Sequence, residues 1–197
     1  MYTTRPSFVF GFHGTDKTVA MKILTQETVL VQSENTYDWL GKGTYFWENS
    51  YERALQYAKT DMKRSGSKIK EPFVLGAVID LGNCFDLLDQ KYLDFLQLAY
   101  EDLKETVKAE KNGKLPQNKK FGIEDFDFRK RELDCAVIRW AHKIAEEQNE
   151  KFDTVRAAFQ EGKELYPGAG FKKHNHIQIA VINTNSIKGI FLPREKS

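Results

Sequence analysis

Residues 37–49 read YDWLGKGTYFWEN, and this stretch decides the fold. Two glycines flank Lys42, so the backbone can bend sharply at this point. The Thr-Tyr-Phe-Trp run behind them consists of residues that favour β-strands. The stretch therefore predicts a tight loop that delivers an aromatic strand into a pocket. An ordinary turn before a core strand explains the same residues equally well, and the flanking sequence has to decide between the two interpretations.

Length and charge limit the function classes that remain. With 197 residues, 41% of them hydrophobic, the chain is long enough for one domain with a sizeable core, and we interpret residues 1–197 as a single domain. Lysine and arginine number 30 against 28 acidic residues, which leaves a net charge of +2. This balance does not indicate a nucleic-acid-binding protein by itself, so any basic surface must come from local clustering.

The cysteines and the N-terminus bear on the cellular compartment. Cys84 and Cys135 lie in apolar surroundings without metal-like spacing, and we interpret them as buried thiols in a reducing compartment. Residues 1–6 lack a hydrophobic signal core, and no apolar run is long enough to cross a bilayer. We therefore expect a cytoplasmic protein that does not contact a membrane.

Upstream, residues 7–12 form a short apolar run of β type that is followed by His13, Gly14 and Thr15. Asp16 can cap a helix over residues 17–25. We expect the His-Gly-Thr triplet at the end of the strand, where Gly14 lets a ligand approach the backbone and the other two residues offer hydrogen bonds. A single histidine at a strand end is more often structural than functional, so this motif needs support from elsewhere.

The middle of the chain combines short strands with helices. A strand is expected over residues 28–32, a helix from Asn49 or Ser50 to about residue 63, and a buried strand over residues 72–81. Apolar residues then recur at helical spacing over residues 89–111 and again over 128–148. The basic stretch 111–120 between these two helices is expected to be an exposed loop. We favour a structural insertion for this helical pair over a substrate-recognition element, although the basic loop could contact phosphates.

The last third contains two further strands around a loop. Residues 152–159 and 176–183 have strand character, and a glycine-rich loop with aromatic and charged residues is expected over 160–171. Gln178 interrupts the aliphatic run of the second strand. It is explained by a satisfied core amide, by a solvent-facing position or by a functional role, and the strand alone does not decide. A final short strand is expected over residues 189–192.

In combination, these motifs resemble the ADP-ribosyltransferase superfamily, in the branch of diphtheria toxin and the poly(ADP-ribose) polymerases. The branch carries His, Tyr and Glu on three separate strands, and the matching pieces here are Phe12-His13-Gly14-Thr15, Gly41-Lys42-Gly43-Thr44-Tyr45-Phe46 and the strand of Gln178. The resemblance implies an α+β fold with a split β-sheet around an NAD cleft and a helical pair inserted at about residues 89–148. The chain is also similar to bacterial toxin and phage-defence members.

The resemblance implies a role for each matching residue. His13 would hydrogen-bond the adenosine-side ribose of NAD, and the backbone of Gly14 would hold the nicotinamide amide. Tyr45 would stack on the nicotinamide ring, with Tyr57 as the opposite wall, although the spacing between these tyrosines is one residue longer than expected. The implied contacts to NAD come from His13, Gly14, Thr15, Tyr45, Phe46 and Tyr57. NAD would be a co-substrate, and no metal is required.

The chain departs from the family at the third position, where Gln178 replaces glutamate. An amide can orient a ribose hydroxyl but supplies neither negative charge nor a proton acceptor. Glu161 is the acidic residue best placed to substitute or to position the acceptor, and Glu164 is second. Because chain elongation in the family depends on the missing glutamate, we expect mono-ADP-ribosyl transfer with release of nicotinamide. A binding module for NAD or ADP-ribose without turnover, and an NAD glycohydrolase, remain the alternatives.

The acceptor is the least defined part of the reaction. Tyr166 and Phe171 could stack on a base, and Lys172 and Lys173 could form a basic rim, so RNA or another nucleic acid is slightly favoured over protein. The resemblance to toxins implies a partner that restrains the enzyme, such as an antitoxin or a chaperone. No residue identifies that partner.

Overall fold

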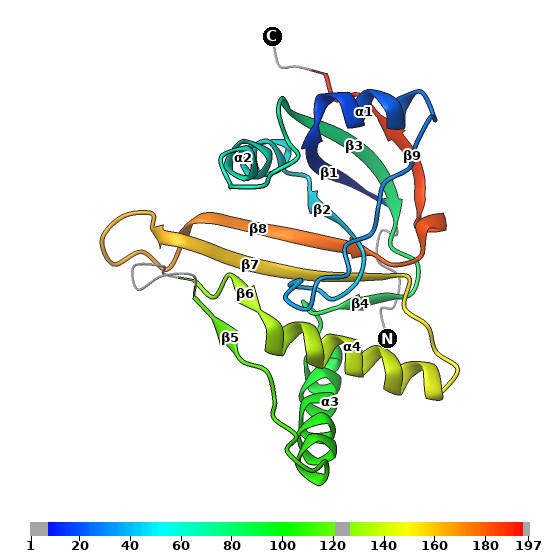
Figure 1. Ribbon diagram of the computed structural model, residues 1–197, viewed down its shortest axis with the longest axis vertical. Helices are drawn as coiled ribbons and strands as arrows, with labels where there is room; N and C mark the ends of the chain where they lie inside the picture. The colour runs from blue at the N-terminus through cyan, green and yellow to red at the C-terminus, as the bar shows by residue number, and fades with distance from the viewer. Residues whose placement is uncertain (1–7, 121–126, 195–197) are drawn as a thin grey trace.

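The computed structural model describes residues 8–120 and 127–194 and contains a mixed seven-stranded sheet (Figure 1). The strand order is β4-β7-β8-β2-β1-β3-β9, and β4 and β7 are parallel whereas the other neighbouring pairs are antiparallel. Two short strands form a separate ladder. The strands are β1 (Phe8–Asp16), β2 (Thr44–Glu48), β3 (Pro72–Asp80), β4 (Cys84–Asp86), β5 (Asn118–Lys119), β6 (Lys130–Arg131), β7 (Thr154–Glu164), β8 (Lys172–Val181) and β9 (Ile187–Phe191).

The helices lie on different parts of this sheet. Figure 1 shows α3 and α4 together on one side of the long β7–β8 hairpin, while α1 lies beside β3 and β9 on the other side. Buried residues from α3, α4, β4 and β7 form the largest core cluster, and α2 packs on β1 and β3. The helices in the described ranges are α1 (Lys17–Leu24), α2 (Tyr51–Met62), α3 (Gln90–Ala109) and α4 (Glu132–Glu147), with a 3₁₀ turn at Thr184–Ser186.

The sheet is weakly connected at its centre. β1 and β2 are registered only at Gly11 opposite Glu48 and Phe12 opposite Trp47, whereas β1 and β3 are registered along all nine residues of each strand. The strands therefore form one group of β4, β7, β8 and β2 and another of β1, β3 and β9. The expected α+β class is confirmed, with one mixed sheet of seven strands.

The predicted helices occur where the sequence placed them, with one change of boundary. Asp16 caps α1 by accepting a hydrogen bond from the Thr18 N–H at 2.9 Å. The second helix of the inserted pair was expected from residue 128 but begins at Glu132, because Lys130–Arg131 pairs with β5. Asn118 in β5 then accepts hydrogen bonds from the first free N–H groups of α4 through its Oδ1. Part of the expected basic loop is thus a strand that caps a helix.

The expected strand over residues 28–32 is wrong. This stretch contributes no strand, and the nearest pairing is an isolated bridge between Ser33 and Gly43. Val29 and Val31 are 76% and 81% exposed. The β-branched residues suggested a buried face that the stretch does not have. Gln32 holds the segment to the sheet through its Nε2, which donates to the Ile182 carbonyl at 2.5 Å.

The expected loop over residues 160–171 is partly wrong, because its first five residues belong to a strand. β7 continues to Glu164 and β8 begins at Lys172, so the connection is limited to residues 165–171. A register shift between Glu161 and Glu164 accommodates Gly162, whose φ of 83° marks a bulge. β1 likewise continues to Asp16, so the His-Gly-Thr triplet lies inside a strand and not at its end.

Three further expectations concern the cysteines, membrane-spanning helices and the N-terminal residues. No disulfide joins the cysteines; Cys135 is buried and Cys84 is half-buried. Among residues 8–120 and 127–194, no helix combines the length and the apolar character that a membrane span needs. The expectation for residues 1–6 lies outside the described residues.

A buried ion cluster joins three strands of the first group. The Arg156 guanidinium on β7 donates two hydrogen bonds to the carboxylate of Glu48, at 2.6 and 2.9 Å, and lies 3.2 Å from Asp86 on β4. Because β8 separates β7 from β2, Arg156 reaches across a strand to Glu48. The hydrogen bonds to Glu48, helped by attraction to both carboxylates, raise the pKa of Arg156 against the opposing effect of burial. The cluster holds β2 and β4 against the β7–β8 hairpin.

Replacing Arg156 by methionine leaves two mostly buried carboxylates without their cation. We expect the free energy of unfolding to fall by about 3 kcal/mol, the usual cost of removing one partner from a buried ion pair. Urea denaturation of the variant measures it. The matched control is Lys108→Met, which removes an exposed pair with Glu105 and should cost at most about 1 kcal/mol. Equal losses in both variants would contradict this role for Arg156.

Candidate functional site

The three motif strands lie next to one another in the sheet, in the order β8-β2-β1. They carry Gln178, Tyr45 and His13 respectively. Tyr45 lies opposite Ala180, and Trp47 lies opposite Gln178 in the register of β2 and β8. Motifs that are far apart in the sequence are thus brought to the place where the two strand groups meet.

His13 bridges β1 and β2 beyond the end of their ladder. Its Nδ1 lies 2.8 Å from the Tyr45 carbonyl oxygen, and since a carbonyl only accepts, Nδ1 carries the hydrogen. Burial lowers the pKa of the imidazole, against the opposing effect of this hydrogen bond, so the ring is neutral near pH 7. The other nitrogen, Nε2, therefore has a free lone pair that can accept a hydrogen bond from a hydroxyl group.

The Tyr45 hydroxyl group is hydrogen-bonded to the backbone of the glycine loop, residues 40–43. It donates to the Gly41 carbonyl at 2.6 Å and accepts from the Leu40 N–H at 2.9 Å. Gly41 has a φ of 75°, the left-handed conformation that the sequence predicted for this bend. Burial raises the pKa of Tyr45, so the hydroxyl remains protonated. Any stacking of a ligand on Tyr45 must use the ring, because its hydroxyl is already satisfied.

Tyr57 packs against a residue that the sequence analysis did not select. Its ring centroid lies 5.0 Å from that of Trp47, at an interplanar angle of 42°, and its side chain is 46% exposed. Trp47 is nearly buried, and within the described part of the chain its indole N–H has no hydrogen-bond partner. Trp47 and Tyr57 thus form an aromatic pair beside β2. The alternation of side chains along β2 was the available signal, because it places Trp47 on the same face as Tyr45.

Gln178 is buried beside this wall. It is 8% exposed and lies between Trp47 on β2 and Ala157 on β7 in the sheet register. Its carboxamide makes no hydrogen bond to any residue in the ranges 8–120 and 127–194. A buried amide normally has partners. Toward the described residues, the hydrogen-bonding groups of the carboxamide are unused.

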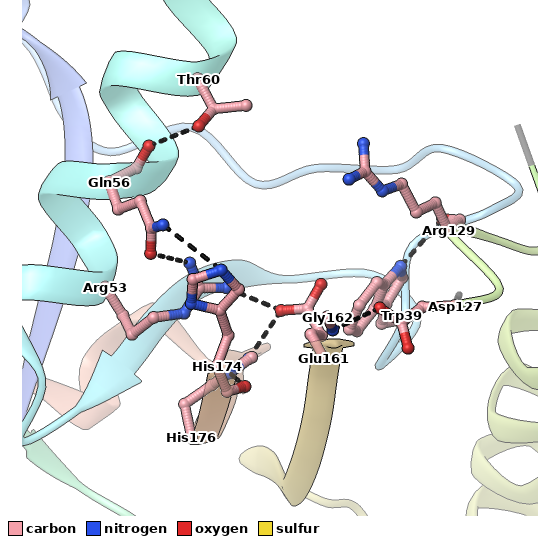
Figure 2. A network of polar contacts seen from close by, with 10 residues as sticks. All are labelled: Trp39, Arg53, Gln56, Thr60, Asp127, Arg129, Glu161, Gly162, His174 and His176. Carbon is pink, nitrogen blue, oxygen red and sulfur yellow. Dashed lines mark hydrogen bonds and ion pairs between the residues drawn. The ribbon is translucent and has the colours of Figure 1, made fainter. Parts of the chain in front are cut away.

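Glu161 is part of a polar network at the other end of the β7–β8 hairpin (Figure 2). One carboxylate oxygen, Oε2, accepts a hydrogen bond from Arg53 of α2 at 2.7 Å and lies 3.6 Å from Nε2 of His176. Burial raises the pKa of Glu161, against the attraction of Arg53. Figure 2 also places His174 within reach of Gln56, at 3.4 Å. Neither Arg53 nor His176 was selected from the sequence.

The sheet register separates Glu161 from Gln178. Glu161 is opposite His174, and Gln178 is opposite Ala157, four residues further along β7. At about 3.3 Å per residue the two positions are about 13 Å apart. Glu161 therefore lies too far along the strand to make the contact that the resemblance implies for the third motif position. Glu164 accepts a hydrogen bond from the Gly168 N–H at 3.0 Å and holds the hairpin loop.

The other residues expected to contact NAD are Phe46, Thr15 and Gly14, and they differ in burial and packing. Phe46 is fully buried in the core, 5.7 Å from the His13 ring between centroids, so it supports His13 and is not exposed to a ligand. Thr15 is half-buried and lies opposite Phe73 in the sheet. A Cβ at Gly14 would lie 2.2 Å from the Ala54 carbonyl oxygen. The absence of a side chain at Gly14 therefore allows close packing of α2, a reason different from the ligand approach that the sequence suggested.

The expected acceptor residues lie around the hairpin loop. Tyr166 and Phe171 are 57% and 61% exposed. Lys172 and Lys173 begin β8; Lys173 is exposed and Lys172 is half-buried. These rings and cations lie beyond Glu161 on the same hairpin and are available to a large partner.

Similarity to known proteins assigns no family to this arrangement of residues. Comparisons with protein-family models, with curated proteins and with solved structures found no match. In the part of the chain that the structure describes, no three His, Cys, Asp or Glu side chains are grouped as a metal ion would need.

Gly14 gives a test of the packing that holds α2 over the site. Gly14→Ala places a methyl group against the backbone of Ala54, and we expect the free energy of unfolding to fall by about 1–3 kcal/mol, as for overpacked cores. Gly189→Ala in β9 is the control, because its added Cβ meets no atom within 4 Å. Urea denaturation compares the two variants. If they were equally stable, the close approach of α2 would not require glycine.

Proposed function

We propose that the protein is a mono-ADP-ribosyltransferase that transfers ADP-ribose from NAD to a macromolecular acceptor and releases nicotinamide. The observation that carries the proposal is that His13, Tyr45 and Gln178 lie on the adjacent strands β1, β2 and β8, with the His13 ring hydrogen-bonded to the Tyr45 carbonyl. The resemblance of the motifs to toxin and phage-defence members extends the proposal to a bacterial toxin or anti-phage effector, held in check by an antitoxin or chaperone.

Each of the three residues has a chemical part in this reaction. The free Nε2 lone pair of His13 accepts a hydrogen bond from a hydroxyl of the adenosine-side ribose. The Tyr45 ring, held by its hydroxyl to the glycine loop, orients the nicotinamide ring by stacking. Gln178 binds a hydroxyl of the nicotinamide-side ribose through its unpaired carboxamide. As the bond between this ribose and nicotinamide breaks, positive charge develops on the ribose, and oriented dipoles stabilise it.

The amide at position 178 limits what the site can do. A carboxylate would supply a full negative charge next to the developing cation, whereas an amide supplies only its carbonyl dipole. A site of this kind supports a single transfer better than repeated elongation, which needs the acceptor ribose to be activated. This is the reason for proposing mono-ADP-ribosylation.

The hairpin loop is the proposed acceptor surface. Tyr166 and Phe171 are exposed aromatic rings next to Lys172 and Lys173, a combination suited to stacking on an unpaired base while the cations contact phosphates. We therefore favour RNA or another nucleic acid slightly over protein as the acceptor.

A catalytically inactive NAD- or ADP-ribose-binding module is the second candidate. The observation that favours it is the absence of a carboxylate at position 178, with Glu161 about 13 Å away along the strands. NAD glycohydrolysis is the third, and it differs from transfer in needing no macromolecular acceptor. Release of nicotinamide separates an enzyme from a binding module, and dependence of that release on an added acceptor separates transfer from hydrolysis.

Labelled NAD tests the reaction directly. The purified protein is incubated with a cell extract and NAD labelled on the adenine side, and the labelled product is digested with nuclease or protease. We expect a label that nuclease removes, and His13→Ala or Tyr45→Ala should abolish it because each removes an NAD contact. A label that only protease removes would identify a protein acceptor. No label and no nicotinamide release, with NAD still bound, would leave the binding module.

The hairpin loop predicts a separation between acceptor and cofactor binding. Alanine in place of Tyr166 and Phe171 removes two exposed rings, each worth about 1–3 kcal/mol if it stacks on a base. Transfer to the extract should fall at least tenfold, while the dissociation constant for NAD, measured by calorimetry, stays within about twofold. Leu192→Ala, at another exposed apolar residue, is the control. Equal losses of transfer and NAD binding would contradict an acceptor role for the loop.

A further inference from the structure

Three side chains from three elements meet at the carboxylate of Glu161 (Figure 2). Arg53 comes from α2, Glu161 from β7 and His176 from β8. The side chains of Arg53 and Glu161 are each 17% exposed, and that of His176 is fully buried. An ion pair so shielded from water holds its geometry better than a surface pair.

No hydrogen atom lies between Oε2 of Glu161 and Nε2 of His176 to form a hydrogen bond. Nδ1 of His176 lies 3.0 Å from the His174 carbonyl oxygen, so Nδ1 carries the hydrogen and Nε2 carries a lone pair. Burial lowers the pKa of His176 to about 4, so the ring is neutral at pH 7 and does not form an ion pair with the carboxylate. Two acceptors thus face each other across 3.6 Å, and Nε2 has no hydrogen-bond partner in the described chain. A proton delivered to this pair would make the missing hydrogen bond.

Arg53 holds the carboxylate in position for such a proton. It donates to Oε2, the same oxygen that faces His176. Figure 2 shows the second oxygen, Oε1, directed away from both partners, and among the described residues Oε1 accepts no hydrogen bond. The buried oxygen is therefore fixed by a cation, while the other oxygen is open to an incoming group.

The position of the pair along the hairpin relates it to the transfer reaction. His176 is two residues from Gln178 on β8, about 7 Å, and the exposed loop of residues 165–171 lies beyond Glu161 in the other direction. The Glu161–His176 pair thus lies along the hairpin between the loop and Gln178. An acceptor that binds at the loop and extends to a ribose at Gln178 would lie next to this pair.

We propose that Glu161 and His176 form a proton-accepting site for the acceptor group in ADP-ribosyl transfer. The inference rests on the proposed function. The bond between ribose C1′ and the nicotinamide nitrogen breaks, and its electron pair leaves with neutral nicotinamide. A lone pair of the acceptor forms the new bond to C1′, and the proton that the acceptor loses passes to Oε1, the open oxygen of Glu161, and from there to solvent. Nε2 of His176, which faces Oε2, is the second proton acceptor of the pair.

This role specifies the class of acceptor. A hydroxyl or an N–H group must lose a proton when it bonds to C1′, so it benefits from a base. A thiolate or a carboxylate carries no proton and would be repelled by the Glu161 carboxylate. The acceptor is therefore a neutral hydroxyl, amino or amide group, such as those that nucleic-acid bases and riboses offer.

The charged surroundings of the pair bear on its response to pH. Arg53 from α2 and Arg131 from β6 stabilise the ionised form of Glu161, and Asp127 opposes them. His174 on β8 lies opposite Glu161 in the sheet register. Since Glu161 must be unprotonated to accept the proton, wild-type transfer should be independent of pH where the carboxylate is ionised and should fall as pH is lowered through its pKa, which burial raises above the usual value. Without the base, transfer depends on hydroxide and rises up to tenfold per pH unit.

The test uses Glu161→Gln and His176→Gln, with the cell extract and adenine-labelled NAD as probes. We expect Glu161→Gln to lower transfer at pH 7 by about 100-fold or more, the usual contribution of a general base, and to replace the plateau by a rise with pH. His176→Gln should show the same trend with a smaller loss. The dissociation constant for NAD should stay within about twofold of wild type. Glu147→Gln, the same substitution at an exposed residue of α4, should not alter either property.

Added formate provides a second readout that a structural role would not move. It should restore part of the activity of a folded Glu161→Ala variant, because a small carboxylate can occupy the vacated space and accept the proton. Loss of transfer by the same factor at every pH, without rescue, would overturn the proton-accepting role, as would unchanged activity in both glutamine variants. If wild-type protein binds NAD but neither transfers nor releases nicotinamide, the proposed function fails first and the inference falls with it.

Discussion

The hydrogen bond from the His13 ring to the Tyr45 carbonyl connects two strands where their own ladder has ended. β1 and β2 share only two registered pairs, so beyond Phe12 the two halves of the sheet separate and the His13 ring spans the space between them. The same bond orients the imidazole and leaves Nε2 free. The candidate site depends on this junction, because a continuous ladder would use the backbone groups that here border it.

The parts of the fold that local chemistry determines could be predicted from the sequence. Asp16 and the apolar stripe behind it specified α1, and helical spacing specified α3 and most of α4. The errors occurred where distant pairing decides. β7 extends through Glu161 because β8 lies beside it. Asn118 begins β5 and caps α4 because the chain returns to it at Arg131 and Leu133. Neither relation leaves a local signal.

The candidate site likewise contains residues that the sequence predicted and residues that it did not. His13, Tyr45 and Gln178 were selected by motif, and the sheet places their strands side by side. Arg53 and His176 were not selected, because an arginine on a helix and a histidine at a strand start have many explanations until Glu161 lies next to both. Sequence order also suggested that Glu161 could replace a carboxylate at position 178, and only the strand register separates the two positions.

We propose that one NAD molecule binds at the junction of β1, β2 and β8. The most direct measurement is a crystal structure of the protein with a non-hydrolysable NAD analogue. We predict the nicotinamide ring on Tyr45, its ribose at the Gln178 carboxamide and the adenosine-side ribose at Nε2 of His13. An analogue bound away from all three residues, or no binding at concentrations that saturate NAD enzymes, would contradict the account.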